Sequence, residues 1–244
     1  MFRFYEELND FLPKDKKKRD FSYSFGGTPS IKDVIESMGI PHTEIDLILV
    51  NGNSVNFSYR LQSNDRISVY PVFESLDISP VMHLHPKPLR ISRFILDVQL
   101  GKLARALRML GFDTLYRNDY QDFEIIDTAI NTKRIILTRD RGILKHKSIT
   151  HGYWVRNTSV NKQVEEIVRR FDLKNQIQPL TRCLLCNEPI KSIKKGTIIN
   201  RLPPGTAKQF DTFYHCTHCD KIYWPGSHYQ RMRKKIDTIL FHLY

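Results

Sequence analysis

Four cysteines in two C-x2-C pairs are the residues whose type and spacing point most directly to chemistry. The pairs read "CLLC" at 183–186 and "CTHC" at 216–219. Two such pairs on one small lobe give the tetrahedral thiolate ligation of a structural zinc ion. Two disulfide bonds are the alternative, which we disfavour because the sequence shows no secretion signal. His215 and His218 lie beside the second pair and could replace a thiolate, although four cysteines already complete the ligand shell. We therefore expect Zn²⁺ at Cys183, Cys186, Cys216 and Cys219.

Two aspartates each follow a short aliphatic run: Asp97 ends "FILD" and Asp140 lies in "RIILTRDRG". In an open parallel sheet, functional groups collect at the carboxyl ends of the strands, and Asp122, which heads the intervening helix, can approach the same crevice. Three carboxylates held together repel one another unless protons or cations intervene, and Mg²⁺ or Mn²⁺ prefers oxygen ligands. Such an ion can activate water and stabilise charge on a phosphodiester. Helix caps and solvated turns are the alternative, and they suit Asp119 and Asp127 better than Asp97.

The positive charge is concentrated after residue 89. The net charge of the 244 residues is +12. Residues 1–89 hold 10 Lys/Arg against 12 Asp/Glu (−2), residues 90–181 hold 17 against 10 (+7), and residues 182–244 hold 11 against 4 (+7). Such asymmetry predicts a polyanionic partner, most economically a nucleic acid.

Six side chains are placed to contact that partner. Three cations recur every three residues along one side of a predicted helix, two flank Asp140, and a histidine in "WPGSH" follows a glycine turn beside aromatic residues. The flanking arginines would hold the nucleic-acid backbone. Solvated surface side chains are the alternative. The expected nucleic-acid contacts are Lys102, Arg105, Arg108, Arg139, Arg141 and His228.

Alternating strands and helices are predicted around the two aspartates, as in an α/β domain with a parallel sheet. Phe94–Leu96 forms a buried strand. A helix follows, with leucines at spacings of three and four and Gly111 at its C-terminal cap. "FDTLY" predicts a strand, "DFEIIDTAINTK" a second helix and "RIILT" a third strand.

The N-terminal segment has the order of elements of a β-grasp fold. "MFRFYEEL" and "DFSYSF" predict two strands around a charged turn, and "PSIKDVIESMGI" predicts a helix capped at Pro29 or Ser30. "DLILVNG" and "DRISVYPV" predict further strands. This run resembles the sulfur-carrier proteins of thiamine and molybdopterin synthesis, which act through a free C-terminal Gly-Gly. The chain continues here without it, so a binding or scaffolding role is the expectation.

Several motifs together resemble the Mut-seven C-terminal RNase domain family: "FILDVQLGKLARALRMLGFDT", "DFEIIDTAI", "RIILTRDRGIL", "RCLLCN" and "HCTHCDKIYWPGSH". That resemblance implies a PIN-like nuclease fold with an appended zinc ribbon and a ubiquitin-like domain upstream. It places the PIN-type acids on Asp97, Asp122 and Asp140, with Glu124 and Asp119 competing for the position of Asp122. Some related PIN-like families carry another acid where this chain has Gly142, so the acidic set is thinner here.

The expected organisation is a ubiquitin-like α+β (β-grasp) domain at 1–85, an α/β PIN-like nuclease domain at 90–180, and a zinc ribbon with a C-terminal basic helix at 181–244. Three prolines within 75–90 mark the first boundary. In the last segment, residues 187–215 separate the two cysteine pairs, a gap that a hairpin can fill.

The function expected from this organisation is a metal-dependent endoribonuclease with Zn²⁺ as structural and Mg²⁺ or Mn²⁺ as catalytic ion. A non-catalytic RNA-binding protein with a PIN-like fold is the alternative. The expected partners are RNA, structured RNA such as tRNA included, and a protein that binds the β-grasp domain, but no membrane. Two glutamates and an aspartate in "MFRFYEELND" replace the apolar stretch of a signal peptide, which predicts a cytoplasmic protein.

Overall fold

The computed structural model of the chain describes residues 1–71, 84 and 92–243. The boundary expected within 75–90 lies outside these residues, apart from Leu84. The chain divides into two compact units, Met1–Ile91 with Gln121–Trp154 and Ser92–Tyr120 with Val155–Tyr244. Neither unit is a continuous stretch of sequence, since each combines a terminal segment with part of the middle of the chain. None of the helices in the described part of the chain has the length and apolar character that a bilayer crossing requires.

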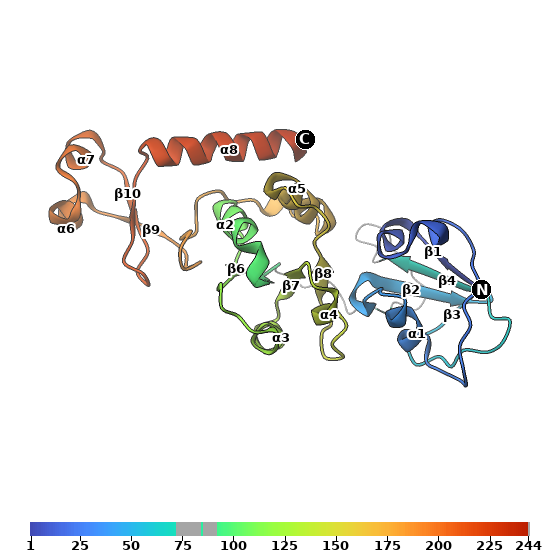
Figure 1. Cartoon of the computed structure of the whole chain (residues 1–244). Coiled ribbons are helices and arrows are strands. Elements are labelled where there is room, and N and C mark those ends of the chain that lie inside the picture. Colours follow the sequence, from blue (N-terminus) through green and yellow to red (C-terminus); the bar gives the residue numbers. More distant parts are fainter. Residues whose placement is uncertain (72–83, 85–91, 244) are drawn as a thin grey trace. The chain divides into compact units, whose positions relative to one another are not determined.

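The N-terminal part of the first unit is a mixed four-stranded sheet with one helix (Figure 1). Its strands are β1 (Phe2–Phe4), β2 (Ile45–Val50), β3 (Asn53–Ser54) and β4 (Ile67–Pro71), in the order β1-β4-β2-β3. β1 and β4 pair in parallel, whereas β2 pairs antiparallel with both β3 and β4. Helix α1 (Ile31–Ser37) begins at Ser30, whose hydroxyl accepts a hydrogen bond from the Asp33 N–H at 3.1 Å. The helix with its cap and the central strands confirm the predicted elements.

Of the two strands predicted at the start of this unit, the first is confirmed only over Phe2–Phe4, and the second is wrong. After β1 the chain turns into a 3-10 helix, Glu6–Phe11, because the buried Asn9 amide donates to the carbonyls of Phe4 and Glu6. The "DFSYSF" segment makes only an isolated bridge between Phe21 and Phe2. Phe21 nevertheless packs on the core of this unit. The alternating aromatic and polar residues of this segment therefore reflect burial of aromatic rings, without pairing to a neighbouring strand.

The rest of the first unit contains α3 (Asp122–Thr132), β7 (Ile135–Thr138), α4 (Arg141–Leu144) and β8 (Gly152–Trp154). β7 is buried along its whole length and pairs in parallel with β8. Short 3-10 turns at Lys14–Lys16 and His42–Glu44 complete this unit.

The second unit begins with β5 (Phe94–Leu96), a 3-10 turn (Val98–Leu100), α2 (Gly101–Met109) and β6 (Thr114–Leu115). β5 and β6 pair in parallel, which bears out the predicted strand-helix-strand order. Gly111 ends α2 at φ +97°, and a Cβ there would lie 2.2 Å from the carbonyl oxygen of Gln178. Glycine is therefore required by the left-handed backbone and by the close approach of another chain segment. Helix α5 (Val160–Arg170) packs against α2, and a 3-10 turn at Lys174–Gln176 follows.

The cysteine segment forms a three-stranded antiparallel sheet in the order β11-β10-β9. The strands are β9 (Lys191–Ile193), β10 (Phe213–His215) and β11 (Ile222–Tyr223). Between β9 and β10 lie α6 (Lys195–Ile198), a 3-10 turn (Ile199–Arg201) and α7 (Pro204–Gln209), so the gap holds two short helices as well as the expected hairpin. Ile198, Leu202 and Phe213 form a small buried cluster in this segment, in which Cys183 and Cys216 are buried as well.

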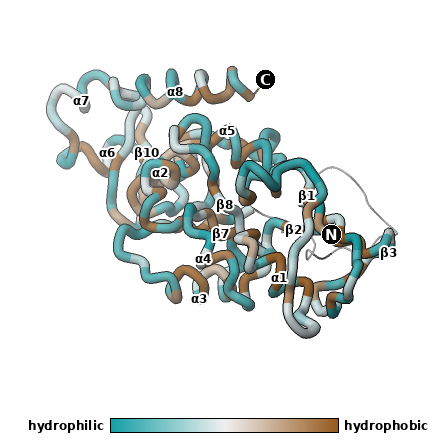
Figure 2. Tube along the Cα trace, turned by 45° about the vertical axis from the view of Figure 1, so that its right-hand side comes forward, coloured by the Kyte–Doolittle hydropathy of each residue, from teal (hydrophilic) through white to brown (hydrophobic). Residues whose placement is uncertain are grey.

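Helix α8 (Ser227–Leu243) closes the second unit. Figure 2 shows polar and apolar residues alternating along it, and its buried residues include Ile236 and Ile239. This side packs against α5, and the guanidinium of Arg169 donates to the His242 carbonyl at 3.0 Å.

Candidate functional site

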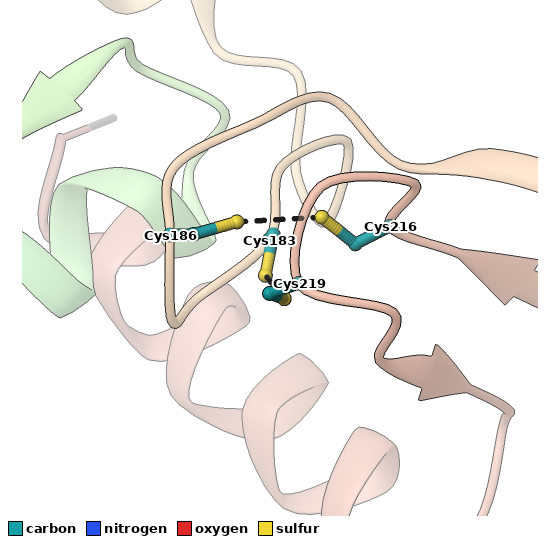
Figure 3. Close-up of side chains that lie close together, drawn as sticks. All are labelled: Cys183, Cys186, Cys216 and Cys219. Atoms are coloured by element: carbon teal, nitrogen blue, oxygen red, sulfur yellow. Dashed lines mark hydrogen bonds between the residues drawn. The ribbon is translucent and has the colours of Figure 1, made fainter.

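The four cysteine sulfurs form one cluster. All lie within 4.8 Å of one another, with Sγ–Sγ distances of 3.4 Å between Cys183 and Cys219 and 3.3 Å between Cys186 and Cys216 (Figure 3). All four cysteines are free thiols, so the disulfide alternative is not formed. Sulfurs that each lie about 2.3 Å from a zinc ion in tetrahedral geometry are about 3.8 Å apart. The donor set and its spacing therefore fit a single tetrahedral ion.

The two cysteine pairs lie in matching turns. In the first, the Cys183 N–H donates to the Glu188 carbonyl at 2.7 Å, and in the second, the Cys216 N–H donates to the Lys221 carbonyl at 2.9 Å. The residue after each pair is left-handed, Asn187 at φ +74° and Asp220 at φ +59°. Asn and Asp tolerate this conformation better than most residues. In the sequence, the Asn or Asp that follows each pair, in "CLLCN" and "CTHCD", is the feature that indicates this left-handed turn.

A tyrosine supports the first sulfur. The Tyr223 hydroxyl lies 3.0 Å from the Cys183 sulfur and accepts a hydrogen bond from the Leu184 N–H at 3.3 Å. Burial raises the pKa of Cys183, but the hydrogen bonds from Tyr223 and from backbone N–H groups outweigh it and lower that pKa to about 6. Burial instead raises the pKa of Cys186 to about 12. Neighbouring thiolates repel one another, so a bound cation is what would allow all four sulfurs to ionise together.

The first cysteine turn is joined to the end of α2 by a buried arginine. Arg108 is 5% exposed and donates to the carbonyls of Thr114, Leu184 and Leu185 at 2.9, 3.2 and 2.9 Å. Burial lowers its pKa, and the charges of the neighbouring Cys183 and of other groups act in the opposite direction. The expected RNA contact from Arg108 is therefore wrong, because its guanidinium points into the protein. The spacing of three residues indicated that Arg108 shares a side of the helix with Lys102 and Arg105. It did not indicate that the first cysteine turn covers the last turn of the helix.

Asn187 completes this junction. Its side-chain oxygen accepts from the Thr114 N–H at 2.8 Å, and its amide donates to Asp113 at 2.7 Å. Arg182 adds a bond from its Nε to the Gly111 carbonyl at 3.1 Å. Neither role was predicted from the sequence, although each residue adjoins the first cysteine pair.

The three expected carboxylates occupy different environments. Asp97 directly follows β5 in the second unit and is only 5% exposed. Asp140 lies two residues after the end of β7 in the first unit, is exposed, and accepts a hydrogen bond from the Gly142 N–H at 2.6 Å. Asp122 is the exposed first residue of α3 in that same unit.

The two competitors of Asp122 have structural partners. Glu124 completes a capping box, since its carboxylate accepts from the Gln121 N–H at 2.9 Å. Asp119 pairs with Arg117 through bonds of 2.9 and 3.0 Å, which lower the pKa of Asp119. Asp122 is thus the better candidate of the three.

The remaining expected RNA contacts divide between two places. Arg141 is half-buried, with its guanidinium 4.2 Å from the ring centre of Trp154 and 4.9 Å from that of Phe11. The centres of these two rings are themselves 4.8 Å apart, so the guanidinium lies against one aromatic pair, and its contact with RNA stays a prediction. Arg139 is half-buried directly before Asp140. Lys102, Arg105 and His228 line a single cavity of about 1030 Å³ in the second unit.

Comparison with known proteins assigns the chain to a family. Residues 92–236 match the family described as Mut7-C RNAse domain, and residues 1–77 match the one described as Mut7-C ubiquitin. No curated protein and no solved structure matches the chain. The first match includes the three carboxylates and all four cysteines, and it covers more than half of the sequence. The chain therefore belongs to the Mut7-C RNAse domain family and carries that family's ubiquitin-like domain at its N-terminus.

Proposed function

We propose that this protein is a metal-dependent endoribonuclease. The observation that carries the proposal is the match to the Mut7-C RNAse domain over residues 92–236, which includes Asp97, Asp122 and Asp140. Two further observations support it. Asp97 comes directly after a buried strand and Asp140 two residues after another, each strand belonging to a parallel pair, and the surrounding sequence is rich in Lys and Arg.

The fold that we propose for residues 92–236 is a PIN-like nuclease domain with a zinc ribbon. Parallel strands alternating with helices support the first assignment, and two matching cysteine turns beside an antiparallel sheet support the second. The zinc ligands would be the four clustered thiolates, with the Tyr223 hydroxyl orienting one of them.

Asp97, Asp122 and Asp140 would hold Mg²⁺ or Mn²⁺. The chemistry of these side chains suits such an ion, because hard divalent cations prefer carboxylate oxygens. When bound, such an ion supplies an activated water and stabilises charge on the phosphodiester. Asp140 uses one oxygen to cap α4, which orients the carboxylate and leaves its second oxygen as a potential ligand. Arg139, next to it, would hold a substrate phosphate.

Cleavage of RNA by the purified full-length chain tests this proposal. A fluorescently labelled RNA is incubated without divalent cation, with Mg²⁺ or with Mn²⁺, and no chelator is added because it would also remove zinc. We expect cleavage only with Mg²⁺ or Mn²⁺, and its loss in Asp97→Asn and in Asp140→Asn. Asp127→Asn, an exposed carboxylate change in α3, is the matched control and should cleave normally. Wild-type turnover by folded Asp97→Asn protein would exclude the carboxylate site.

A non-catalytic RNA-binding protein is the second candidate. The hydrogen bond from the Gly142 N–H to Asp140 favours it, because this carboxylate already has a structural role as a helix cap. Gly142 also stands where related families carry a further acid. Under this alternative, the wild-type protein binds the RNA and leaves it intact with either metal.

A further inference from the structure

One cleft in the second unit joins residues that lie far apart in the sequence. It has a volume of about 1030 Å³ and is lined by α2, the start of α5, the end of α7, β11 and the first turns of α8. This volume lies at the upper end of the range for small-ligand sites, roughly 300–1,000 Å³. It is therefore large enough for a short stretch of a polymer and too small for a folded partner.

The lining of the cleft is positively charged. Five cations reach it, from α2, from α8 and from the loop before β11, and all five are exposed. Among the described residues that line it, none is Asp or Glu. Such a one-sided distribution favours an anion with several charges over a zwitterion or a neutral molecule. The cations are Lys102, Arg105, Lys221, Arg231 and Lys235.

Aromatic rings form a second feature of the same lining. Trp224, Tyr229 and Phe210 are half-buried, so part of each ring is accessible. The turn at Gly226 positions the indole: the Gly226 N–H donates to the Trp224 carbonyl at 2.9 Å, and a Cβ at Gly226 would lie 2.8 Å from the indole nitrogen. The glycine of "WPGSH" thus allows Trp224 to lie against the turn beside His228.

We propose that this cleft binds a short single-stranded segment of RNA, with bases against Trp224 and Tyr229 and phosphates on Lys102, Arg105 and Arg231. The proposal rests on the ribonuclease function and names the form of its substrate. Aromatic faces beside a basic groove are the combination with which proteins bind unpaired nucleotides. A base within a duplex is stacked on both sides and offers no free face to an indole. Loops and ends of structured RNA provide such unpaired nucleotides.

Binding is measured separately from cleavage. The zinc-loaded full-length protein is titrated, without Mg²⁺ or Mn²⁺, into three fluorescein-labelled probes: a ten-nucleotide RNA, its duplex, and an abasic strand of the same charge. We expect the single strand to bind most tightly and the abasic strand to lose about tenfold or more in affinity, because stacking stabilises each base. Equal affinity for all three probes would overturn the proposal, since it would show recognition of charge alone.

Two sets of variants locate the binding. Lys102→Glu with Arg105→Glu should weaken binding of the single strand and reduce its logarithmic salt dependence by roughly 1.4, at about 0.7 for each phosphate contact. Lys162→Glu with Lys191→Glu, which changes the same charge at exposed positions outside the cleft, is the control. Trp224→Leu should abolish the preference for the strand with bases and the quenching of tryptophan fluorescence by RNA. Unchanged binding by both cleft variants would refute the site.

The outcomes also separate this proposal from the ribonuclease proposal. Normal binding by a protein that never cleaves would reject the nuclease and retain the cleft. Cleavage that persists in the Lys102→Glu, Arg105→Glu protein with unchanged affinity would retain the nuclease and reject the cleft. An acidic peptide that displaces the RNA as effectively as unlabelled strand does would show a general polyanion site and overturn the single-strand proposal.

Discussion

The two appended segments of this protein, the ubiquitin-like domain and the cysteine segment, are attached to the middle of the chain by different physical means. The ubiquitin-like domain has its own core, a cluster of fifteen buried apolar residues drawn from its sheet and helix. Apart from the buried Cys183 and Cys216, the described residues 181–226 bury three apolar side chains, Ile198, Leu202 and Phe213. A segment with so small a core generally needs a metal or a disulfide to be stable. The first segment is thus stabilised by burial of apolar surface, and the second depends on its cysteine cluster.

The ubiquitin-like domain contacts the segment around Asp140 through side chains. The Trp154 N–H donates to Glu44 at 2.7 Å, and a His42 ring nitrogen lies 2.9 Å from the Ile149 carbonyl. Trp154 packs on the core of the ubiquitin-like domain, and its indole N–H donates to the Arg139 carbonyl at 3.2 Å. A domain for which the sequence suggested a separate protein partner therefore holds the loop that carries Asp140.

The cysteine segment contacts the end of α2 mainly through backbone carbonyls. Arg108 and Arg182 donate to carbonyls on both sides of the junction, and Asn187 bonds to a backbone N–H. Such bonds require the cysteine turn to keep its shape. Loss of the proposed zinc ion should therefore release this junction and leave the other intact.

Removal of zinc is expected to have the largest effect. Structural zinc in small thiolate sites contributes roughly 10–16 kcal/mol to folding, so Cys216→Ser should unfold much of residues 181–243 and spare residues 1–71. Limited proteolysis followed by mass spectrometry measures this, alongside zinc content. His218→Ser, an exposed change between the second pair of cysteines, is the control and should retain one zinc per chain. If both segments resisted proteolysis equally after metal loss, the cysteine segment would not depend on the metal for its fold.

The buried arginine of the cysteine junction should give an intermediate effect. Arg108→Met leaves three carbonyls without their donor and should lower the free energy of unfolding by about 2–4 kcal/mol. Arg105→Met, one turn earlier on the exposed side of α2, should change it by less than about 0.5 kcal/mol. Urea denaturation followed by circular dichroism measures both variants. Similar values for the two would mean that the Arg108 bonds add no net stability.

The stacked arginine of the other junction should give the smallest effect. Arg141→Met retains apolar contact with Phe11 and Trp154 but removes the cation, which should cost about 1 kcal/mol. Lys147→Met, an exposed change nearby, is the control. Denaturation midpoints of both proteins provide the measurement. If Arg141→Met lowered the free energy of unfolding as much as Arg108→Met does, the attachment of the ubiquitin-like domain would depend on one charged group as strongly as the cysteine junction does.

Features that depend on neighbouring residues could be predicted from the sequence. The helix that starts at Ser30, the buried strands at 94–96 and 135–138 and the glycine that ends α2 follow from capping, apolar runs and backbone freedom. The cysteine spacing likewise predicts the sulfur cluster, because each pair needs only one tight turn. Alternation failed at residues 20–25, where aromatic burial without strand pairing gives the same pattern.

Features that join distant residues were decided by the tertiary structure alone. Arg105 and Arg108 have the same charge on the same helix, yet one lines an open cleft and the other is covered by a turn 76 residues later in the chain. The cleft brings α2 together with the segment "YWPGSHY" near the C-terminus. Arg141, in the middle of the chain, likewise contacts the ring of Phe11 near the N-terminus. Local patterns report the periodicity of an element and its own backbone preferences. Which side chain is covered, and by what, depends on how separate elements pack, and no local pattern contains that information.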